Sequence, residues 1–391
     1  MKSLKSLLSN SIKLAITTLV IAEFFVGGLA IARVPDLECN SPQELGKVKK
    51  KKSKIKTFVS EYWRTAESKI KGYPAELQAK GYVVGDPHLE NVDVFLNTRS
   101  KTNPIQLTFN DLDEAGHNYL LGDLLKYISY LQSLKKQGLD LKRIIAKYSD
   151  GLNGKPAAIP AELEALLRMT PDEYKKAERK YVSKQRIKGV QLAMTKISKE
   201  EQDMLAALRN MKVIQNLSEV EAWTDQNSKG SSAGMTRYLF YGKNQVVGND
   251  GKLQPIGVEG IIEYKELSCT AAGDSLKQNL ESDLEAFVEY DARFLDLPIE
   301  QSFLGRQAVI YINNQHFLAR SKSPGLYKDI GVESASPALV QTHGEYLAWF
   351  LGKFHRENAT VGYRETVLSQ MDFLIAESIA ISKAFTSSAT N

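Results

Sequence analysis

The sequence predicts an α+β fold, in which short strands and amphipathic helices occupy separate stretches of the chain. Two observations predict it. Short apolar runs typical of β-strands cluster within 82–109 and again within 235–320. Apolar residues at helical spacing dominate from residue 120 and again from residue 337. Strands and helices that are segregated along the chain are typical of the α+β class.

Length and composition limit the possible classes of protein. The 391 residues are enough for two lobes or domains, and 43% hydrophobic with 25% charged residues is a globular composition. The formal net charge of +5 is small for this length, so a general nucleic-acid binder is not implied.

Residues 1–32 have the layout of a secretory signal peptide. An apolar run, Ile16–Val26, follows the lysines at 2, 5 and 13, and Ala30-Ile31-Ala32 provides a small-residue cleavage site. The alternative is an uncleaved inner-membrane anchor, because residues 14–32 are just long enough to span a bilayer. Glu23 within the run opposes a stable span. The expected destination is therefore the periplasm or the exterior.

Residues 33–80 are predicted to be an N-terminal helical segment that starts at Ser41-Pro42-Gln43-Glu44, a capping box with proline in the first turn. The helix carries a dense basic run, made of Lys47, Lys49, Lys50, Lys51, Lys52, Lys54 and Lys56, before it becomes amphipathic near Val59 and Trp63. The run is either a solvated helix face or a contact for a membrane surface or phosphate. The two cysteines, Cys39 and Cys269, either pair in an oxidising compartment or stay as free thiols.

Residues 81–135 hold the most informative motif. Gly85-Asp86-Pro87-His88-Leu89-Glu90-Asn91 lies between two predicted strands, at 82–84 and 92–96. A third predicted strand, 105–109, leads into Asn110-Asp111-Leu112-Asp113. Two carboxylates and an amide oxygen are the hard ligands that Mg²⁺ prefers when it is shared with phosphate. We expect a hairpin-like platform with these acids at its tips; the simpler alternative is that Asp and Asn are here as turn formers.

A helix is predicted to start near Leu120, with Asp123 in its first turn. Asp123 either stabilises the helix N-terminus or ties the helix to the preceding loop. Residues 136–224 follow as a helical insertion with breaks near 151–160 and 169–171 and no chemical motif.

Together these motifs resemble a known catalytic core. Asp86-x-His88-x-x-Asn91, then Asp111, then Gly122-Asp123-Leu124, is similar to aminoglycoside phosphotransferases and, more distantly, to protein kinases. A closer resemblance is to the bacterial family called domain of unknown function 2252, over about residues 81–359. The resemblance implies that Asp86, with His88, is catalytic, that Asn91 and Asp111 bind Mg²⁺ with Asp113 as a spare ligand, and that Asp123 is structural.

Residues 225–322 then resemble the nucleotide-clamping half of such a site. A turn contributes Gly230, Ser231, Ser232 and Gly234, and a predicted strand at 260–266 carries Lys265. A helix predicted from about Asp274 to Phe294 carries Glu289, or less favourably Glu285, as the partner of Lys265. The alternative for Lys265 is an edge-strand lysine that blocks aggregation. A hairpin at 307–320 completes a small mixed sheet, and residues 323–391 supply closing helices at 337–356 and 365–385. His343 and His355 on the first of these are expected to be packing or surface residues.

The order of these parts differs from that of kinases, because the acids precede the lysine. The resemblance therefore implies a circularly permuted, protein-kinase-like two-lobed fold with a cleft between its lobes. It also implies ATP and Mg²⁺ as cofactors and transfer of a phosphoryl or nucleotidyl group to an unknown hydroxyl. Two alternatives remain open: an exported, non-catalytic binding protein of the same shape, and a basic surface protein that binds anionic lipid or polymer through residues 47–56.

Overall fold

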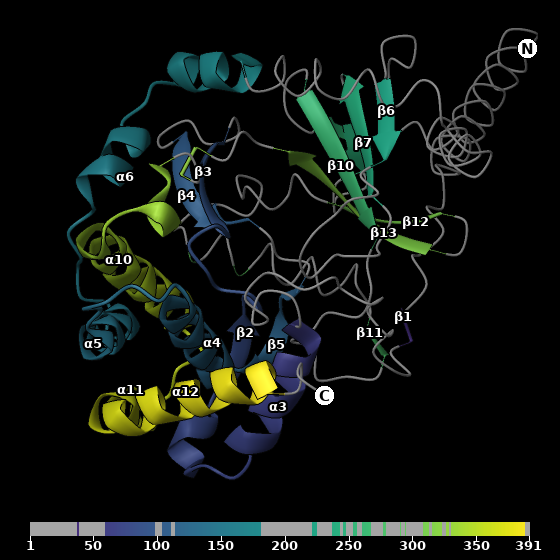
Figure 1. Cartoon of the computed structure of the whole chain (residues 1–391). Helices are drawn as coiled ribbons and strands as arrows, with labels where there is room; N and C mark the ends of the chain where they lie inside the picture. The colour runs from purple at the N-terminus through teal and green to yellow at the C-terminus, as the bar shows by residue number, and fades with distance from the viewer. Residues whose placement is uncertain are drawn as a thin grey trace, which may run out of the picture. The chain divides into compact units, whose positions relative to one another are not determined.

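A computed structural model gives the architecture of the chain (Figure 1). It divides the chain into two units, Met1–Pro35 and Asp36–Asn391. The described residues all belong to the second unit: 37–38, 59–97, 104–110, 114–180, 221–224, 237–242, 245–247, 253–255, 260–266, 277–278, 290, 294, 308–312, 315–322, 326–327 and 330–387.

The hydrophobic core of this unit is largely helical. Its helices are α3 (Val59–Ile70), α4 (Leu120–Ser133), α5 (Leu141–Leu152), α6 (Ala161–Leu167), α10 (Pro337–His355), α11 (Val361–Ser369) and α12 (Met371–Ser387), and residues 171–180 are also helical. Helix α4 is the most deeply buried of them, because its residues from Leu120 to Leu131 are all shielded from solvent. It packs against α3, α10 and α12. The helix predicted to start near Leu120 is confirmed as α4, and α3 is helical as expected for the described part of segment 33–80, whose predicted start at Ser41 lies outside the described residues.

Helices α5 and α10 cross at unusually close range (Figure 1). A Cβ on Gly151 would lie 2.1 Å from the carbonyl oxygen of Trp349, and one on Gly352 would lie 2.0 Å from that of Tyr148. Only glycine permits this backbone approach at either position. Helix α5, which comes from the predicted insertion, therefore packs directly into the main core.

The closing helices are confirmed in type but not in number. Helix α10 begins at the predicted Pro337, where the Ser336 hydroxyl caps it by accepting the Leu339 N–H at 3.3 Å. The second expected helix is divided at Gln370 into α11 and α12. The division allows α12 to pack against α4, while α11 packs against α5 and the 3₁₀ helix η1 (Ala75–Gln78).

Four short strands form two antiparallel ladders, of which the β2–β5 ladder packs against α4. Strand β2 (Lys80–Val83) pairs with β5 (Gly116–Tyr119), and β3 (Val92–Leu96) pairs with β4 (Ile105–Phe109). The sequence placed β3 and β4 correctly, because their apolar and β-branched residues are fully buried.

Five further strands form one sheet in the order β12-β13-β10-β7-β6, as Figure 1 shows. Their bounds are β6 (Glu221–Thr224), β7 (Arg237–Gly242), β10 (Gly260–Glu266), β12 (Ala308–Ile312) and β13 (Gln315–Lys322). The predicted hairpin is confirmed, since Ile312 pairs with Gln315. The expected mixed sheet is wrong, because every neighbouring pair is antiparallel. The β12–β13 pair is a tight hairpin, whereas β10 pairs with β13 across a long stretch of sequence.

Two minor ladders complete the described strands. They pair β1 (Leu37–Glu38) with β11 (Lys277–Gln278), and β8 (Gln245–Val247) with β9 (Leu253–Pro255). The start of the helix predicted from Asp274 is therefore wrong, since Lys277 and Gln278 are extended and pair with a segment far away in the sequence. A tertiary pairing of this kind overrides weak local helix propensity. At the other end of that prediction, Tyr290 and Phe294 are helical.

Several sequence predictions lie outside the described residues: the signal peptide or anchor at 1–32, the lysine run at 47–56, and both Cys39 and Cys269. Within the described part of the chain, no helix is both long enough and apolar enough to cross a membrane.

Candidate functional site

The Asp86 motif lies at a break between the two small ladders. Val83 of β2 pairs with Gly116 of β5, and Val92 of β3 pairs with Phe109 of β4. Residues 84–91 form a first loop between these two pairs, and on the other side of the break the structure describes Asn110, Glu114 and Ala115 of a second loop, 110–115. Asp86 therefore lies where one small ladder ends and the next begins, while the expected tip with Asp111 and Asp113 lies outside the described residues.

Residues at both ends of the second loop contact the first. The Asn110 N–H donates to the Asn91 carbonyl at 3.1 Å. At the other end, a Cβ added to Gly85 would lie 1.9 Å from the carbonyl oxygen of Glu114. The predicted metal ligands Asp111 and Asp113 lie between these two contacts in the sequence, and they fall outside the described residues.

Side chains of α4 and α3 hold the backbone of loop 84–91 through hydrogen bonds. The two carboxylate oxygens of Asp123 accept the N–H groups of Val84 at 2.6 Å and Gly85 at 3.0 Å. The indole Nε1 of Trp63 donates to the Gly85 carbonyl at 2.7 Å. Gly85 has φ +85°, a conformation that side chains with a Cβ rarely adopt. The structure thus confirms that Asp123 ties the helix to the loop.

Asp123 also connects the loop to the C-terminal helices. His355 Nε2 lies 3.1 Å from Asp123 Oδ2, and His355 Nδ1 lies 2.8 Å from the hydroxyl of Tyr148. An ionised carboxylate can only accept, so Nε2 carries the proton and Nδ1 accepts from Tyr148. The Tyr148 hydroxyl lies 3.0 Å from that of Tyr363. All four side chains are fully buried, and His355 is a packing residue as expected.

The carboxylate of Asp86 is buried and lies between the ammonium group of Lys126 and the ring of His88. Its Oδ1 lies 3.1 Å from Lys126 Nζ, and its Oδ2 lies 3.5 Å from His88 Nε2. Burial alone would raise the pKa of Asp86, but the Lys126 ammonium and the His88 ring outweigh it and lower the pKa below its usual range. The carboxylate is therefore ionised and is a weak proton acceptor.

His88 has its ring fixed on both sides. Its Nδ1 accepts the Glu90 N–H at 3.2 Å, so Nε2 carries the proton that points toward Asp86. The ring also packs against Tyr130, with centroids 5.4 Å apart, and the Tyr130 hydroxyl donates to Glu333 Oε1 at 2.5 Å. Within the described residues, His88, Glu90 and Glu333 present ligand atoms that lie within 4.8 Å of one another.

Asn91 is oriented by its neighbours in the loop. Its Nδ2 donates to the Asp86 carbonyl at 3.0 Å, and its backbone N–H donates to the His88 carbonyl at 3.0 Å. Since Nδ2 is used inside the loop, the amide oxygen Oδ1 points the other way and is the atom that can bind a cation.

Lys265 lies on β10, the central strand of the five-stranded sheet, and its side chain is fully buried. The alternative of an edge-strand lysine is therefore wrong. Glu263, two residues earlier on the same face, is buried as well. The other residues predicted for the nucleotide, Gly230, Ser231, Ser232, Gly234 and Glu289 with its alternative Glu285, lie outside the described part of the chain.

Sequence reasoning missed the residues that hold Asp86 and the loop, above all Lys126 and Trp63. A signal was present: Lys126 is the one basic residue within the apolar sequence of α4, LLGDLLKYISYLQS, three positions after Asp123. Two opposite charges one turn apart inside a buried helix need partners within the core.

No family model, curated protein or solved structure matches this chain.

Proposed function

We propose that the protein is a Mg²⁺-dependent phosphotransferase that moves a phosphoryl group, or alternatively a nucleotidyl group, from ATP to a hydroxyl acceptor. The observation that carries the proposal is that loop 84–91 contacts Asn110 and Glu114, the described residues on either side of Asp111 and Asp113. One loop holds an ionised carboxylate at Asp86 and an amide oxygen at Asn91, and the other leads from Asn110 into Asp111.

The position of Lys126 divides the roles of the oxygen ligands. A lysine ammonium 3.1 Å from Asp86 repels a divalent ion, so Asp86 is a poor primary ligand for Mg²⁺. Asn91, with Asp111 and Asp113 from the second loop, is the better ligand set, because amide and carboxylate oxygens suit this ion. Bound Mg²⁺ would supply charge neutralisation for the phosphates.

Asp86 would then orient the acceptor. Its ionised oxygens accept a hydrogen bond from the attacking hydroxyl, and His88 supports it from the opposite side. The hydroxyl oxygen forms a bond to the γ-phosphorus while the bond to the ADP oxygen breaks, and the hydroxyl proton leaves through Asp86 to water. Phosphoryl transfer is catalysed mainly by positioning of the reactants and electrostatic stabilisation of the transition state, and Asp86 would contribute to the positioning.

The five-stranded antiparallel sheet supports the nucleotide part of the proposal. A buried lysine on its central strand, beside a buried glutamate, is a suitable group for neutralising phosphate charge. We assign Lys265 this role, with the turn 230–234 covering the phosphates and Glu289 holding the lysine. A permuted kinase-like fold with two lobes accounts for this order of parts and belongs to the same proposal.

The test is a melting-temperature screen of the full chain with nucleotides, each with and without Mg²⁺. The proposal expects stabilisation by ATP only when Mg²⁺ is present, by about 2.7 kcal/mol at a ligand concentration of about 100 Kd. Formation of ADP from ATP, or of pyrophosphate for nucleotidyl transfer, with and without added alcohols, then measures turnover. Equal stabilisation by ATP with and without Mg²⁺ would exclude the proposed metal site.

One observation favours a non-catalytic nucleotide-binding protein as the second candidate. The Asp86–Lys126 ion pair occupies a carboxylate oxygen and weakens Asp86 as a base. The two candidates agree on Mg²⁺-dependent ATP binding and differ in turnover, so binding without formation of ADP or pyrophosphate under any acceptor condition supports the second.

A further inference from the structure

We propose that Lys126 is a positioning residue that fixes the carboxylate of Asp86, so that helix α4 sets both the backbone and the reactive side chain of loop 84–91. Its effect on catalysis rests on the function proposed above. The geometric part, a carboxylate whose shortest described contact is with Lys126, stands on the structure of the loop itself.

Two residues of α4 contact loop 84–91 from neighbouring positions on the helix. Asp123 and Lys126 are three residues apart and therefore share one face of the helix. Asp123 accepts the N–H groups of Val84 and Gly85, and Lys126 contacts the next residue, Asp86, at 3.1 Å. One turn of a buried helix thus controls three consecutive residues of the loop.

Both side chains of the Asp86–Lys126 ion pair are buried. The side chain of Lys126 is 1% exposed and that of Asp86 is 8% exposed, so neither group exchanges its partner freely with water. Removal of one member of such a pair leaves a buried charge without its counter-ion, which is much more costly than loss of a surface pair. Without Lys126 the carboxylate would keep only the longer contact with His88, at 3.5 Å, so its orientation depends mainly on the lysine.

Lys126 is itself held in place. Its ammonium lies 4.9 Å from the ring centroid of Tyr62, a distance that favours a cation–π contact. The Tyr62 hydroxyl donates to the Gly122 carbonyl at 2.7 Å, which ties α3 to α4. The neighbouring residue, Trp63, holds the Gly85 carbonyl. Adjacent residues of α3 therefore support the lysine and the loop together.

The test is a double-mutant cycle on the full chain with Asp86→Asn, Lys126→Met and the double variant, followed by urea unfolding. Lys126→Met is expected to be the least stable of the three, because it leaves the buried Asp86 carboxylate with His88 alone, whereas in Asp86→Asn the amide oxygen can still accept from Lys126. Adding Asp86→Asn is expected to recover part of the loss, since it removes that charge. If the two single effects simply add, Lys126 does not hold Asp86 and the proposal is wrong.

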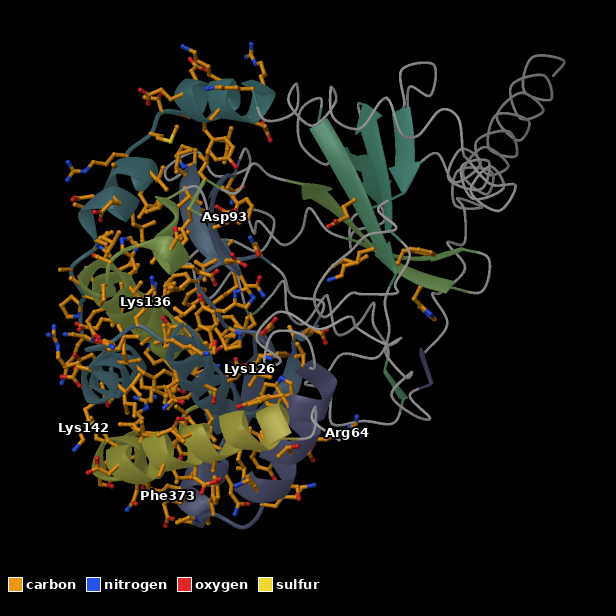
Figure 2. The ribbon with its side chains drawn as sticks, viewed as in Figure 1. Arg64, Asp93, Lys126, Lys136, Lys142 and Phe373 are labelled. Atoms are coloured by element: carbon orange, nitrogen blue, oxygen red, sulfur yellow. The ribbon has the colours of Figure 1, made fainter. Side chains whose placement is uncertain are left out.

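The chain offers a matched control pair. Lys142 and Asp372 form an ion pair at 2.8 Å, but their side chains are 59% and 81% exposed. Figure 2 shows Lys142 at the periphery of the helical core and Lys126 in its interior. The same cycle with Lys142→Met and Asp372→Asn is expected to give small, additive effects. Equal coupling in both cycles would contradict the role of burial.

The second measurement separates positioning from direct phosphate binding. With Mg²⁺-ATP and water as the acceptor, Lys126→Met is expected to slow phosphate release by roughly 10- to 100-fold while the Kd for nucleotide changes less than about twofold. Lys126→Arg keeps the charge and is expected to recover most of the rate. In the Asp86→Asn background, Lys126→Met is expected to have no further effect on the rate.

Two results would overturn the proposal: a loss of nucleotide affinity in Lys126→Met that matches its loss of rate, or an undiminished effect of this substitution when Asp86 is already Asn. If Lys126→Met does not fold, Lys126→Arg and the double variant give the same comparison. If the parent neither binds Mg²⁺-ATP nor releases phosphate, the proposed function fails, and the unfolding cycle still decides whether Lys126 holds Asp86.

Discussion

The loop around Asp86 and the contact between α3 and α12 use similar groups in different surroundings. At the loop, an acid lies 3.1 Å from Lys126 and 3.5 Å from His88. At the helix contact, Glu377 accepts from Lys69 at 2.9 Å and from Tyr73 at 2.5 Å. The distances are shorter at the helix contact, but the side chains of Lys69 and Glu377 are 36% and 21% exposed.

This comparison shows that burial, rather than distance, decides what each contact does. Water can replace the partners of Glu377, so that contact adds only a little to stability. At the loop the partners cannot be replaced, and the loss of one leaves a polar group stranded in the core. The loop is therefore rigid and fixed in one geometry, which suits a site that positions reactants.

The largest effect is expected from Gly85→Ala. The new Cβ would lie 1.9 Å from the Glu114 carbonyl oxygen, and φ at this position is +85°. Strain and overpacking together predict a loss of about 4 kcal/mol or more in the free energy of unfolding, measured with urea.

Gly138→Ala is the matched control. Gly138 has φ +81°, but a Cβ added at this position would have no atom within 4 Å, so only the backbone strain remains. The free energy of unfolding is expected to fall by about 1 kcal/mol. If both variants were equally stable, the close approach of the two loops at Glu114 would be wrong.

The next effect is expected from Asp123→Asn. The amide supplies one acceptor oxygen where two are used, and it turns an N–H₂ group toward donors of Val84, Gly85 and His355. The free energy of unfolding is expected to fall by about 3 kcal/mol, and hydrogen exchange at the Val84 and Gly85 amides is expected to become faster. Asp140→Asn, at the exposed N-cap of α5, is expected to stay within about 0.5 kcal/mol of the parent. Similar losses in both variants would contradict a special role for Asp123.

The smallest effect is expected from Glu377→Gln, and it depends on pH. Burial raises the pKa of Glu377, but the Tyr73 hydroxyl and the Lys69 ammonium outweigh it and lower the pKa in the folded state. The stabilisation is therefore present above the unfolded pKa of about 4.3 and is lost as the pH falls through the lower folded value. At pH 7 the free energy of unfolding of the parent should exceed that of Glu377→Gln by about 0.5 kcal/mol. At a pH below the folded pKa of Glu377 the difference should almost vanish. A difference that grows on acidification would contradict the assignment.

The sequence predicted much of the framework around the site. Strands β3 and β4 and helix α4 follow from local apolar patterns, which report burial directly. The motif also placed Asp86 and Asn91 in one loop, since they are only five positions apart.

What the sequence could not predict depends on partners that are distant in the chain. Lys126 and Trp63 show no local sign of where their polar atoms go, because their partners lie 40 and 22 positions away. The pairing of Lys277–Gln278 with Leu37–Glu38 is equally non-local and replaced an expected helix. Tertiary contacts of this kind select among several local choices that have similar energies.

The most direct test of the central claim is a calorimetric titration of Mg²⁺-ATP into the parent and into Asp111→Ala. The account predicts that the parent binds ATP only with Mg²⁺ and that Asp111→Ala weakens this binding by roughly 10-fold or more, as expected for loss of a charged ligand. Equal affinity in the two proteins would contradict the metal site on which the proposed function depends.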